Sequence, residues 1–225
     1  MAAIPLELLK SVRFADALAE KARAPSRACD WPELDSILPD GGLPHAVVEI
    51  SCAHHAFAGA TRVAVSAIAA AQRRSRGAWC AWMDADSTLY APGLARAGVD
   101  LARLLVVRSA HSESRRPGFA GSVDPRVVVT CASSGAFDIV VVEVHHLTRA
   151  EKFVRKLALA CEQHGTTIVL LAAPHQDAWP VALRLEVSRN RDGLDVRVTK
   201  DRFGRLPPRL AKTHVPIAPP WTRTA

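Results

Sequence analysis

Apolar runs alternate along the chain with segments whose apolar residues recur at helical spacing. The runs with the fewest polar residues predict buried strands at 47–51, 79–83, 104–108, 139–142 and 167–172. The segments between them predict helices at 61–74, 91–97, 125–132 and 149–164. Strands that alternate with helices in this way favour an α/β fold with a mostly parallel central sheet flanked by helices.

The chain before this alternating core has a different pattern. Leu6 to Ala24 places apolar residues on one helical face and predicts an N-terminal helical arm within residues 1–27. Its apolar face either packs on its own domain or is offered to a partner. Prolines and glycines follow, and they predict that regular structure restarts only at Ala46.

The C-terminal part also changes character. Two apolar segments, 182–188 and 194–199, are separated by a polar turn and predict a C-terminal β-hairpin appended to the sheet edge. Several prolines follow Gly204, and proline lacks the N–H that ladder pairing needs. We therefore expect one core domain over residues 28–205 and an extended, flexible tail without ladder pairing over 206–225.

Composition places the chain among ordinary globular proteins. It has 225 residues, of which 49% are hydrophobic and 23% are charged, enough to bury one large core. Its apolar runs are shorter than the ~20 residues of a membrane helix, and Met1 to Lys10 lacks the pattern of a secretory signal. We expect a cytoplasmic protein without membrane contact. Its five cysteines are widely spaced and odd in number, and are expected to be reduced core residues.

The net charge of +7 is compatible with nucleic acid or with an acidic protein partner. The basic residues are scattered, apart from small clusters. One of these is Arg115 and Arg116, which fall in a predicted loop and are candidates for contact with a phosphate backbone. Arginines in such a loop are more often exposed to water than bound to phosphate, so we expect DNA binding to be weak or indirect.

The junction between the first strand and the next helix is where a parallel sheet would bind phosphate, because backbone amides are free there. A working phosphate loop needs glycines, a lysine for the β and γ phosphates, and a Ser or Thr hydroxyl for magnesium. Aligned on its final threonine, the segment 54–61 keeps Gly59 and Thr61. His54 replaces the first glycine and Ala60 replaces the lysine. The segment is either a decayed phosphate loop or an ordinary connection, and ATP binding should be weak or absent.

Three further residues bear on nucleotide chemistry. In a working ATPase, Asp86 would orient the attacking water and Glu143 would reach the magnesium shell, since both stand near strand ends. Carboxylates at such places are as often caps of helices and loops. Arg62 follows the lysine position by two residues and is a candidate substitute for it. The alternative hypothesis is therefore an unconventional ATPase that uses Arg62 and Asp86.

Other chemistry has less support. The pairs His54-His55 and His145-His146 follow strand ends, near Cys52, and imidazole and thiolate groups bind zinc. Adjacent histidines point in different directions, however, and no CxxC or HxxxH spacing is present. We interpret them as surface loop histidines and expect no metal. The chain also lacks the G-x-S-x-G motif of many hydrolases.

Several stretches resemble known proteins. Those that resemble the entry to the core of RecA-type recombinases are Trp31 to Asp35, Gly41 to Pro44 and Val48 to Ile50. Those that narrow the resemblance to the ImuA-like members of the RecA-like family are Ala81 to Leu94, Ala97 to Asp100 and Leu104 to Arg108. Phe137 to Glu143 and the end of the hairpin, Val198 to Gly204, fit the same pattern. The resemblance covers residues 28 to 205.

This resemblance implies a RecA-like P-loop core and a role in bacterial SOS mutagenesis cassettes. It implies a DNA damage response factor of translesion synthesis that works with ImuB, an inactive Y-family-like protein, and with an error-prone replicative-type polymerase. Residues 173–180 leave little room for the mobile DNA-binding loops of recombinases. We therefore expect a non-catalytic protein that binds ImuB or RecA and blocks or caps RecA filaments.

Overall fold

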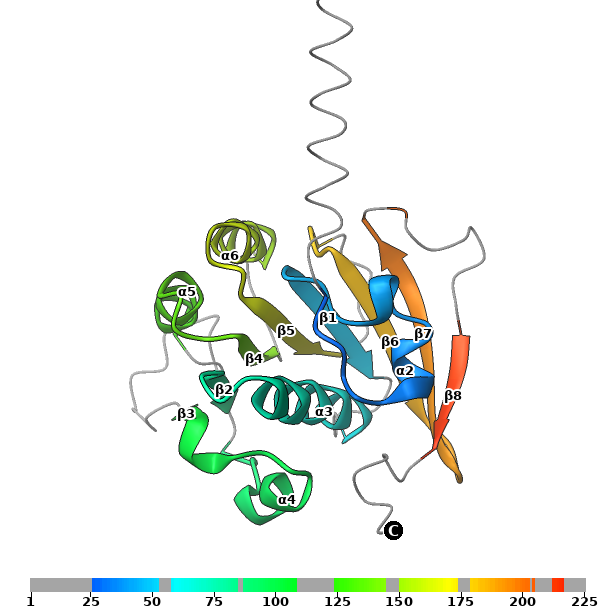
Figure 1. Cartoon of the computed structure of the whole chain (residues 1–225). Coiled ribbons are helices and arrows are strands. Elements are labelled where there is room, and N and C mark those ends of the chain that lie inside the picture. Colours follow the sequence, from blue (N-terminus) through cyan, green and yellow to red (C-terminus); the bar gives the residue numbers. More distant parts are fainter. Residues whose placement is uncertain are drawn as a thin grey trace, which may run out of the picture.

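The computed structural model of the chain describes residues 26–52, 58–84, 87–108, 124–144, 150–173, 179–202, 204 and 212–216. Within these residues eight strands form a single sheet in the order β3-β2-β4-β5-β1-β6-β7-β8 (Figure 1). The strands are β1 (Val47–Cys52), β2 (Cys80–Asp84), β3 (Leu104–Arg108), β4 (Ile139–Val144), β5 (Thr167–Ala172), β6 (Leu183–Arg189), β7 (Gly193–Asp201) and β8 (Lys212–Pro216).

The six strands from β3 to β6 in this order pair in parallel. β7 and β8 are antiparallel additions beyond β6. The prediction of an α/β fold with a mostly parallel sheet and an appended hairpin is therefore confirmed.

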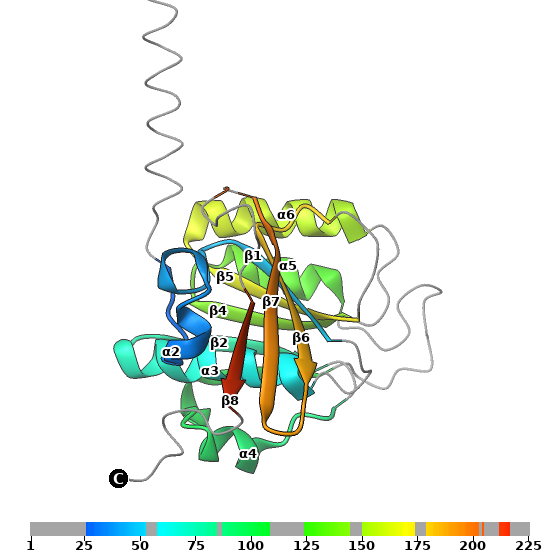
Figure 2. The same cartoon turned by 90° about the vertical axis from the view of Figure 1, so that its right-hand side faces the viewer.

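The helices cover both faces of the sheet (Figures 1 and 2). α3 (Ala58–Arg74) and α4 (Ala91–Arg96) lie on one face, and α5 (Pro125–Ser133) and α6 (Ala150–His164) lie on the other. The short helix α2 (Pro32–Asp35) packs on the α3 side, where the Ser66 hydroxyl donates to the Cys29 carbonyl at 2.8 Å. Two 3-10 turns, η1 (Pro39–Gly41) and η2 (Leu101–Arg103), complete the described elements.

Alternation along the central strands builds a core on each face. In β4, Val141 belongs to the cluster under α3 and its neighbour Val140 to the cluster under α5 and α6. All six residues of β1, β4 and β5 are buried, as expected for parallel strands covered on both faces. The one carboxylate inside β1, Glu49, is paired with Arg184 of β6 at 2.9 Å, which offsets the cost of its burial.

The predicted boundaries agree closely with the structure for most elements. The strands predicted at 104–108 and 167–172 have these bounds, and the helix predicted at 125–132 extends one residue further. The helix predicted from residue 61 begins at Ala58, so the connection after β1 is shorter than expected.

The prediction that regular structure restarts only at Ala46 is wrong. α2 begins at Pro32, whose fixed φ suits the first helical position. The Asp35 carboxylate accepts hydrogen bonds from the backbone N–H groups of Cys29 and Trp31, at 2.8 and 3.1 Å. Arg27 also forms an isolated bridge with Leu43. Hydrogen bonds between a side chain and the backbone hold this segment in place, and the spacing of apolar residues along the sequence gives no sign of them.

The prediction that residues beyond Gly204 cannot join a ladder is also wrong. β8 pairs with β7 over five residues, and its Val215 is fully buried. The four residues before Pro216 contain no proline, so their N–H groups are available for pairing. Thr213 and Val215 are β-branched and suit a strand, although prolines flank this run.

Some predicted features lie outside the described residues: the N-terminal arm, the predicted loop that carries Arg115 and Arg116, and most of the segment 206–225. Within the described chain, no helix is long and apolar enough to cross a membrane. The five cysteines are free and buried, as expected. Burial raises the pKa of Cys80 and of Cys161 to about 12, which keeps these thiols protonated and unreactive.

Candidate functional site

The parallel strands end at one edge of the sheet, and the chain leaves neighbouring strands there in opposite directions. β2 and β4 are adjacent. The chain from β2 leads to α4 on one face, and the chain from β4 leads to α6 on the other (Figure 1). Such a switch in direction opens a crevice at the carboxyl ends of the strands, where α/β proteins bind ligands.

A cleft of about 570 Å³ lies at this place, between the first turns of α3, the segment after β2, and α4. Its wall combines apolar and aromatic side chains with two arginines and one carboxylate. The lining residues are Trp31, Ala58, Thr61, Arg62, Val65, Thr88, Leu89, Tyr90, Gly93, Leu94, Arg96, Ala97 and Glu143. Its volume is that of a site for a small molecule or a few side chains.

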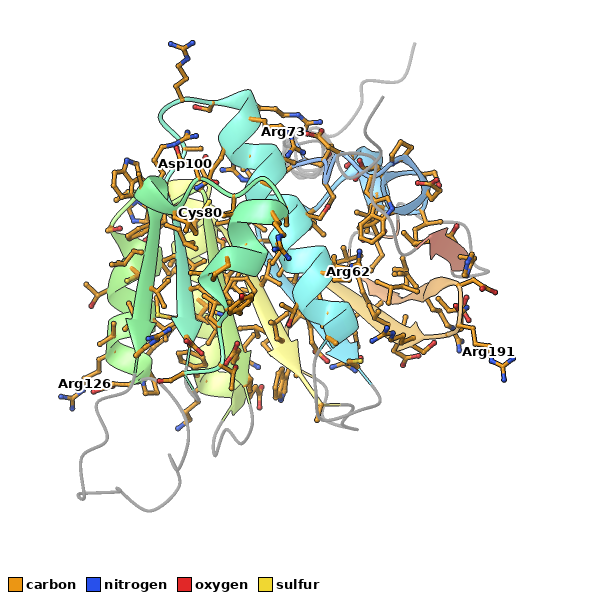
Figure 3. The ribbon with its side chains drawn as sticks, turned by 90° about the horizontal axis from the view of Figure 1, so that it is seen from below. Arg62, Arg73, Cys80, Asp100, Arg126 and Arg191 are labelled. Atoms are coloured by element: carbon orange, nitrogen blue, oxygen red, sulfur yellow. The ribbon has the colours of Figure 1, made fainter. Side chains whose placement is uncertain are left out.

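Thr61 and Arg62 line the cleft from α3, and both are partly buried. Figure 3 shows Arg62 on this helix. Burial, and after it the nearby charge of Arg189, lowers the pKa of the Arg62 guanidinium. The start of α3 and the end of β6 therefore bring two cations close together.

Glu143 lines the cleft from β4 and is 8% exposed. Its Oε1 accepts a hydrogen bond from Trp82 Nε1 of the neighbouring β2 at 3.0 Å. The indole holds the carboxylate in a fixed position at the end of the sheet.

Asp84, at the end of β2, is fully buried and acts as a cap. Its carboxylate accepts hydrogen bonds from the backbone N–H groups of Thr88 and Leu89, and from Arg108 Nε at 3.1 Å. These bonds fix the turn that carries Tyr90, which is 68% exposed, to the mouth of the cleft.

The start of α3 is packed into the core. A Cβ added at Gly59 would come within 2.8 Å of Val187 Cγ1 in β6 and 3.3 Å of Leu194 Cδ2 in β7. Ala60, at the position of the phosphate-loop lysine, is 0% exposed and belongs to the core cluster under α3. Close packing therefore accounts for the small residues at both positions, and a lysine at 60 would have to be accommodated inside this core.

Residues 36–181 match the family described as MT3502 N-terminal domain. The chain belongs to this family. The match covers well over half of the chain, from the end of α2 to the residues before β6. No curated protein sequence matches the chain significantly.

In this member of the MT3502 N-terminal domain family, most of the cleft comes from the matched segment, whereas Trp31 precedes it. Val187 and Leu194, which contact the start of α3, follow it. The packing that determines residue 59 therefore involves strands beyond the matched segment.

The structure brings together three of the residues predicted from the sequence, Thr61, Arg62 and Glu143, in one cleft. Gly59 and Ala60 lie beside it in the core. His54, Asp86, Arg115 and Arg116 lie outside the described residues, as do the histidine pairs considered for zinc. Among the residues that the structure does describe, no group of three or more His, Cys, Asp or Glu could hold a metal ion.

Sequence reasoning missed Trp31, Tyr90 and Arg96 as residues of the cleft. Trp31 and Tyr90 belong to stretches that the sequence singled out, but only for their resemblance. Chemically, the two arginines suit an anionic group and the apolar wall suits a hydrophobic or aromatic body.

Proposed function

We propose that the chain is a non-catalytic RecA-like accessory factor of SOS-induced translesion DNA synthesis and mutagenesis. It acts by binding an ImuB-like protein, RecA or both, together with an error-prone replicative-type polymerase. The proposal rests on the resemblance of residues 28–205 to ImuA-like proteins. The observation that carries its non-catalytic part is the complete burial of Ala60 at the position of the phosphate-loop lysine.

Losing that lysine removes the main charge that would neutralise a triphosphate. A charge-assisted hydrogen bond contributes ~1.5–3 kcal/mol, and a methyl group inside the core contributes none of it. Gly59 gives no independent sign of phosphate binding, because contact with Val187 explains it. This supports a protein that binds ATP weakly or not at all and acts through contacts.

The finer fold, a RecA-like P-loop core, belongs to the same proposal. It is supported by the parallel sheet, by the order in which α3 follows β1, and by the antiparallel strands β7 and β8 beyond β6. A subunit of this shape without ATP chemistry would occupy the end of a RecA filament without extending it. We expect such a subunit to cap filaments and to be cytoplasmic.

The test uses the purified full chain with RecA and with an ImuB-like protein, immobilised in turn for binding measurements. RecA strand exchange is then followed with increasing amounts of the chain. We expect saturable binding to at least one protein and inhibition of strand exchange at substoichiometric ratios. Absence of binding to both, with strand exchange unchanged, would refute the proposal.

One observation favours a second candidate, an unconventional DNA-stimulated ATPase. Thr61, Arg62 and Glu143 all line the same cleft, as a nucleotide site would require. Titration with a fluorescent ATP analogue distinguishes the two candidates. Micromolar binding that is lost in Arg62→Ala but kept in Arg155→Ala, on the exposed surface of α6, would favour the ATPase.

A further inference from the structure

Exposed apolar side chains gather at one edge of the sheet. Among the described residues, the large apolar side chains that remain more than one third exposed are Trp79, Tyr90, Leu101, Leu105, Val106, Val127 and Leu159. Leu105 and Val106 lie on β3, and Leu101 lies in the turn just before it. These three residues, with the outer side of β3, are called the β3 edge below. Figure 1 shows β3 at the end of the sheet opposite β8.

The edge is uncovered on both faces. Leu105 and Val106 are consecutive and therefore point to opposite faces, yet they are 41% and 37% exposed. Leu105 lies beside Ala81, whose side chain joins the core under α5 and α6. Val106 lies beside Trp82, whose side chain joins the core under α3. The described helices therefore leave these two side chains partly exposed, although Leu104 and Val107 still pack against the two cores.

Within the part of the chain that the structure describes, β3 also lacks the usual protection of an edge strand. Soluble proteins protect such edges with charged residues, prolines or bulges, because the outer backbone groups otherwise pair with another strand. The sequence Leu-Leu-Val-Val-Arg has one charge, at its end. That residue, Arg108, is paired with Asp84 at 3.1 Å, and Arg103, before the strand, is paired with Asp100 at 2.7 Å. The strand thus presents an apolar surface whose flanking charges are balanced within the chain.

We infer that the β3 edge pairs with the β3 edge of a second copy of this chain. In an antiparallel arrangement centred on Val106, that residue lies opposite Val106 of the second copy. Leu105 then lies opposite Val107 of the second copy on one face. Leu104 lies opposite the aliphatic stem of Arg108 on the other face. Apolar surface meets apolar surface on both faces, and the two sheets become one.

The charges at the edge favour a second copy over a partner of opposite charge. Arg103 and Arg108 already have acidic partners in their own chain, so no cation at this edge requires an acidic strand. In a two-fold arrangement each copy contributes the same patch. The β3 edges of both copies are then covered, so the contact gives a closed dimer and no filament. This inference is independent of the proposed function.

The interface is small. A strand of five residues with flanking side chains on each copy places it near the low end of specific interfaces, roughly 1,000 Å² in total. We therefore expect a weak, reversible dimer with a dissociation constant on the order of micromolar, within the range that sedimentation measures.

The test is sedimentation velocity of the full chain over about 0.5–300 μM, a range chosen to bracket this constant. Wild type is expected to pass from monomer to dimer. Val106→Lys and Leu105→Asp are expected to weaken dimerisation at least ~tenfold, since each places a charge in the apolar interface. The control is Leu159→Asp, because Leu159 is 55% exposed on α6 and lies outside the edge. This control should dimerise as wild type does, and circular dichroism checks the folding of all variants.

A second measurement needs no substitution. Hydrogen exchange at residues 104–108 should slow as wild-type concentration rises through the dimerisation range, while exchange in β8 stays constant. A chain that remains monomeric throughout the range overturns the inference. So does a dimer that both edge variants leave intact, or one whose formation does not protect β3. Loss of binding to another protein in the edge variants of a monomeric chain would assign the edge to that protein instead.

Discussion

The close contact between the start of α3 and the β6–β7 hairpin predicts that replacing Gly59 by alanine destabilises the protein. The perturbation is Gly59→Ala, which adds one methyl group. The added Cβ would lie 2.8 Å from Val187 Cγ1 and 3.3 Å from Leu194 Cδ2, the first of which is closer than real Cβ contacts allow. Both neighbours are buried side chains, so relief requires these side chains to repack inside the core or α3 and the hairpin to move apart.

Two effects of opposite sign determine the result. Alanine is the better helix former, by up to ~1 kcal/mol, although less in the first turn of a helix. Overpacking of a dense core costs ~1–3 kcal/mol. We expect the second effect to win, with a net loss of about 1–2 kcal/mol in the free energy of unfolding. For a chain of this size the melting temperature should fall by about 2–8 °C.

Urea denaturation and thermal melting measure the change. The matched control is Gly77→Ala, where the added Cβ would meet only Ser75 Oγ at 3.8 Å. A double-mutant cycle with Val187→Ala gives a stricter test, because removing the crowding methyl groups should abolish most of the cost of Gly59→Ala. If Gly59→Ala is as stable as wild type, or if its cost survives in the Val187→Ala background, close packing is not the reason for glycine at this position.

Three further outcomes are expected. Because residue 60 is fully buried, Ala60→Lys should lower the free energy of unfolding by at least about 3 kcal/mol and should not produce ATP binding. A melting temperature equal to that of wild type would mean that the lysine side chain reaches solvent. Glu143→Ala should lower the free energy of unfolding by about 1–3 kcal/mol, because it leaves Trp82 Nε1 without its acceptor. Glu143→Gln should lower it less, and equal melting temperatures for the two variants would contradict this. Burial, and after it the charge of Arg27, lowers the pKa of His45 from its ordinary 6.5. The unfolded chain therefore binds more protons than the folded chain below pH 6.5, and the free energy of unfolding should fall as the pH drops through this range. In His45→Gln, melting curves from pH 7.5 to about 5 should show a smaller fall than in wild type.

The sequence predicted most of the fold because the central strands are buried on both faces. Their nearly continuous apolar runs, such as those at 139–144 and 167–172, give a strong signal that depends on no distant contact. α2 and β8 were missed because their stability comes from distant partners. Trp31 and Val215, for example, are buried only once α3 and β7 are in place beside them.

The candidate site was predicted only in part. Thr61, Arg62 and Glu143 were found because they sit near the ends of predicted strands and helices, where parallel α/β sheets place their chemistry. Arg96 and Tyr90 gave no such signal, since only the crossing of α4 and α3 brings them to the same cleft. The packing role of Gly59 depends on Val187, more than a hundred residues away, and no local pattern encodes that contact.

The family match ends at residue 181, but the sheet continues through β6, β7 and β8. β1 is central only because β6 pairs with it from Val48 to Cys52. A protein shortened to the matched segment would turn β1 into a bare edge, expose the start of α3 where Gly59 now packs, and leave Glu49 without Arg184. We expect such a fragment to aggregate on expression, because the strands that cover β1 and the start of α3 follow the family match.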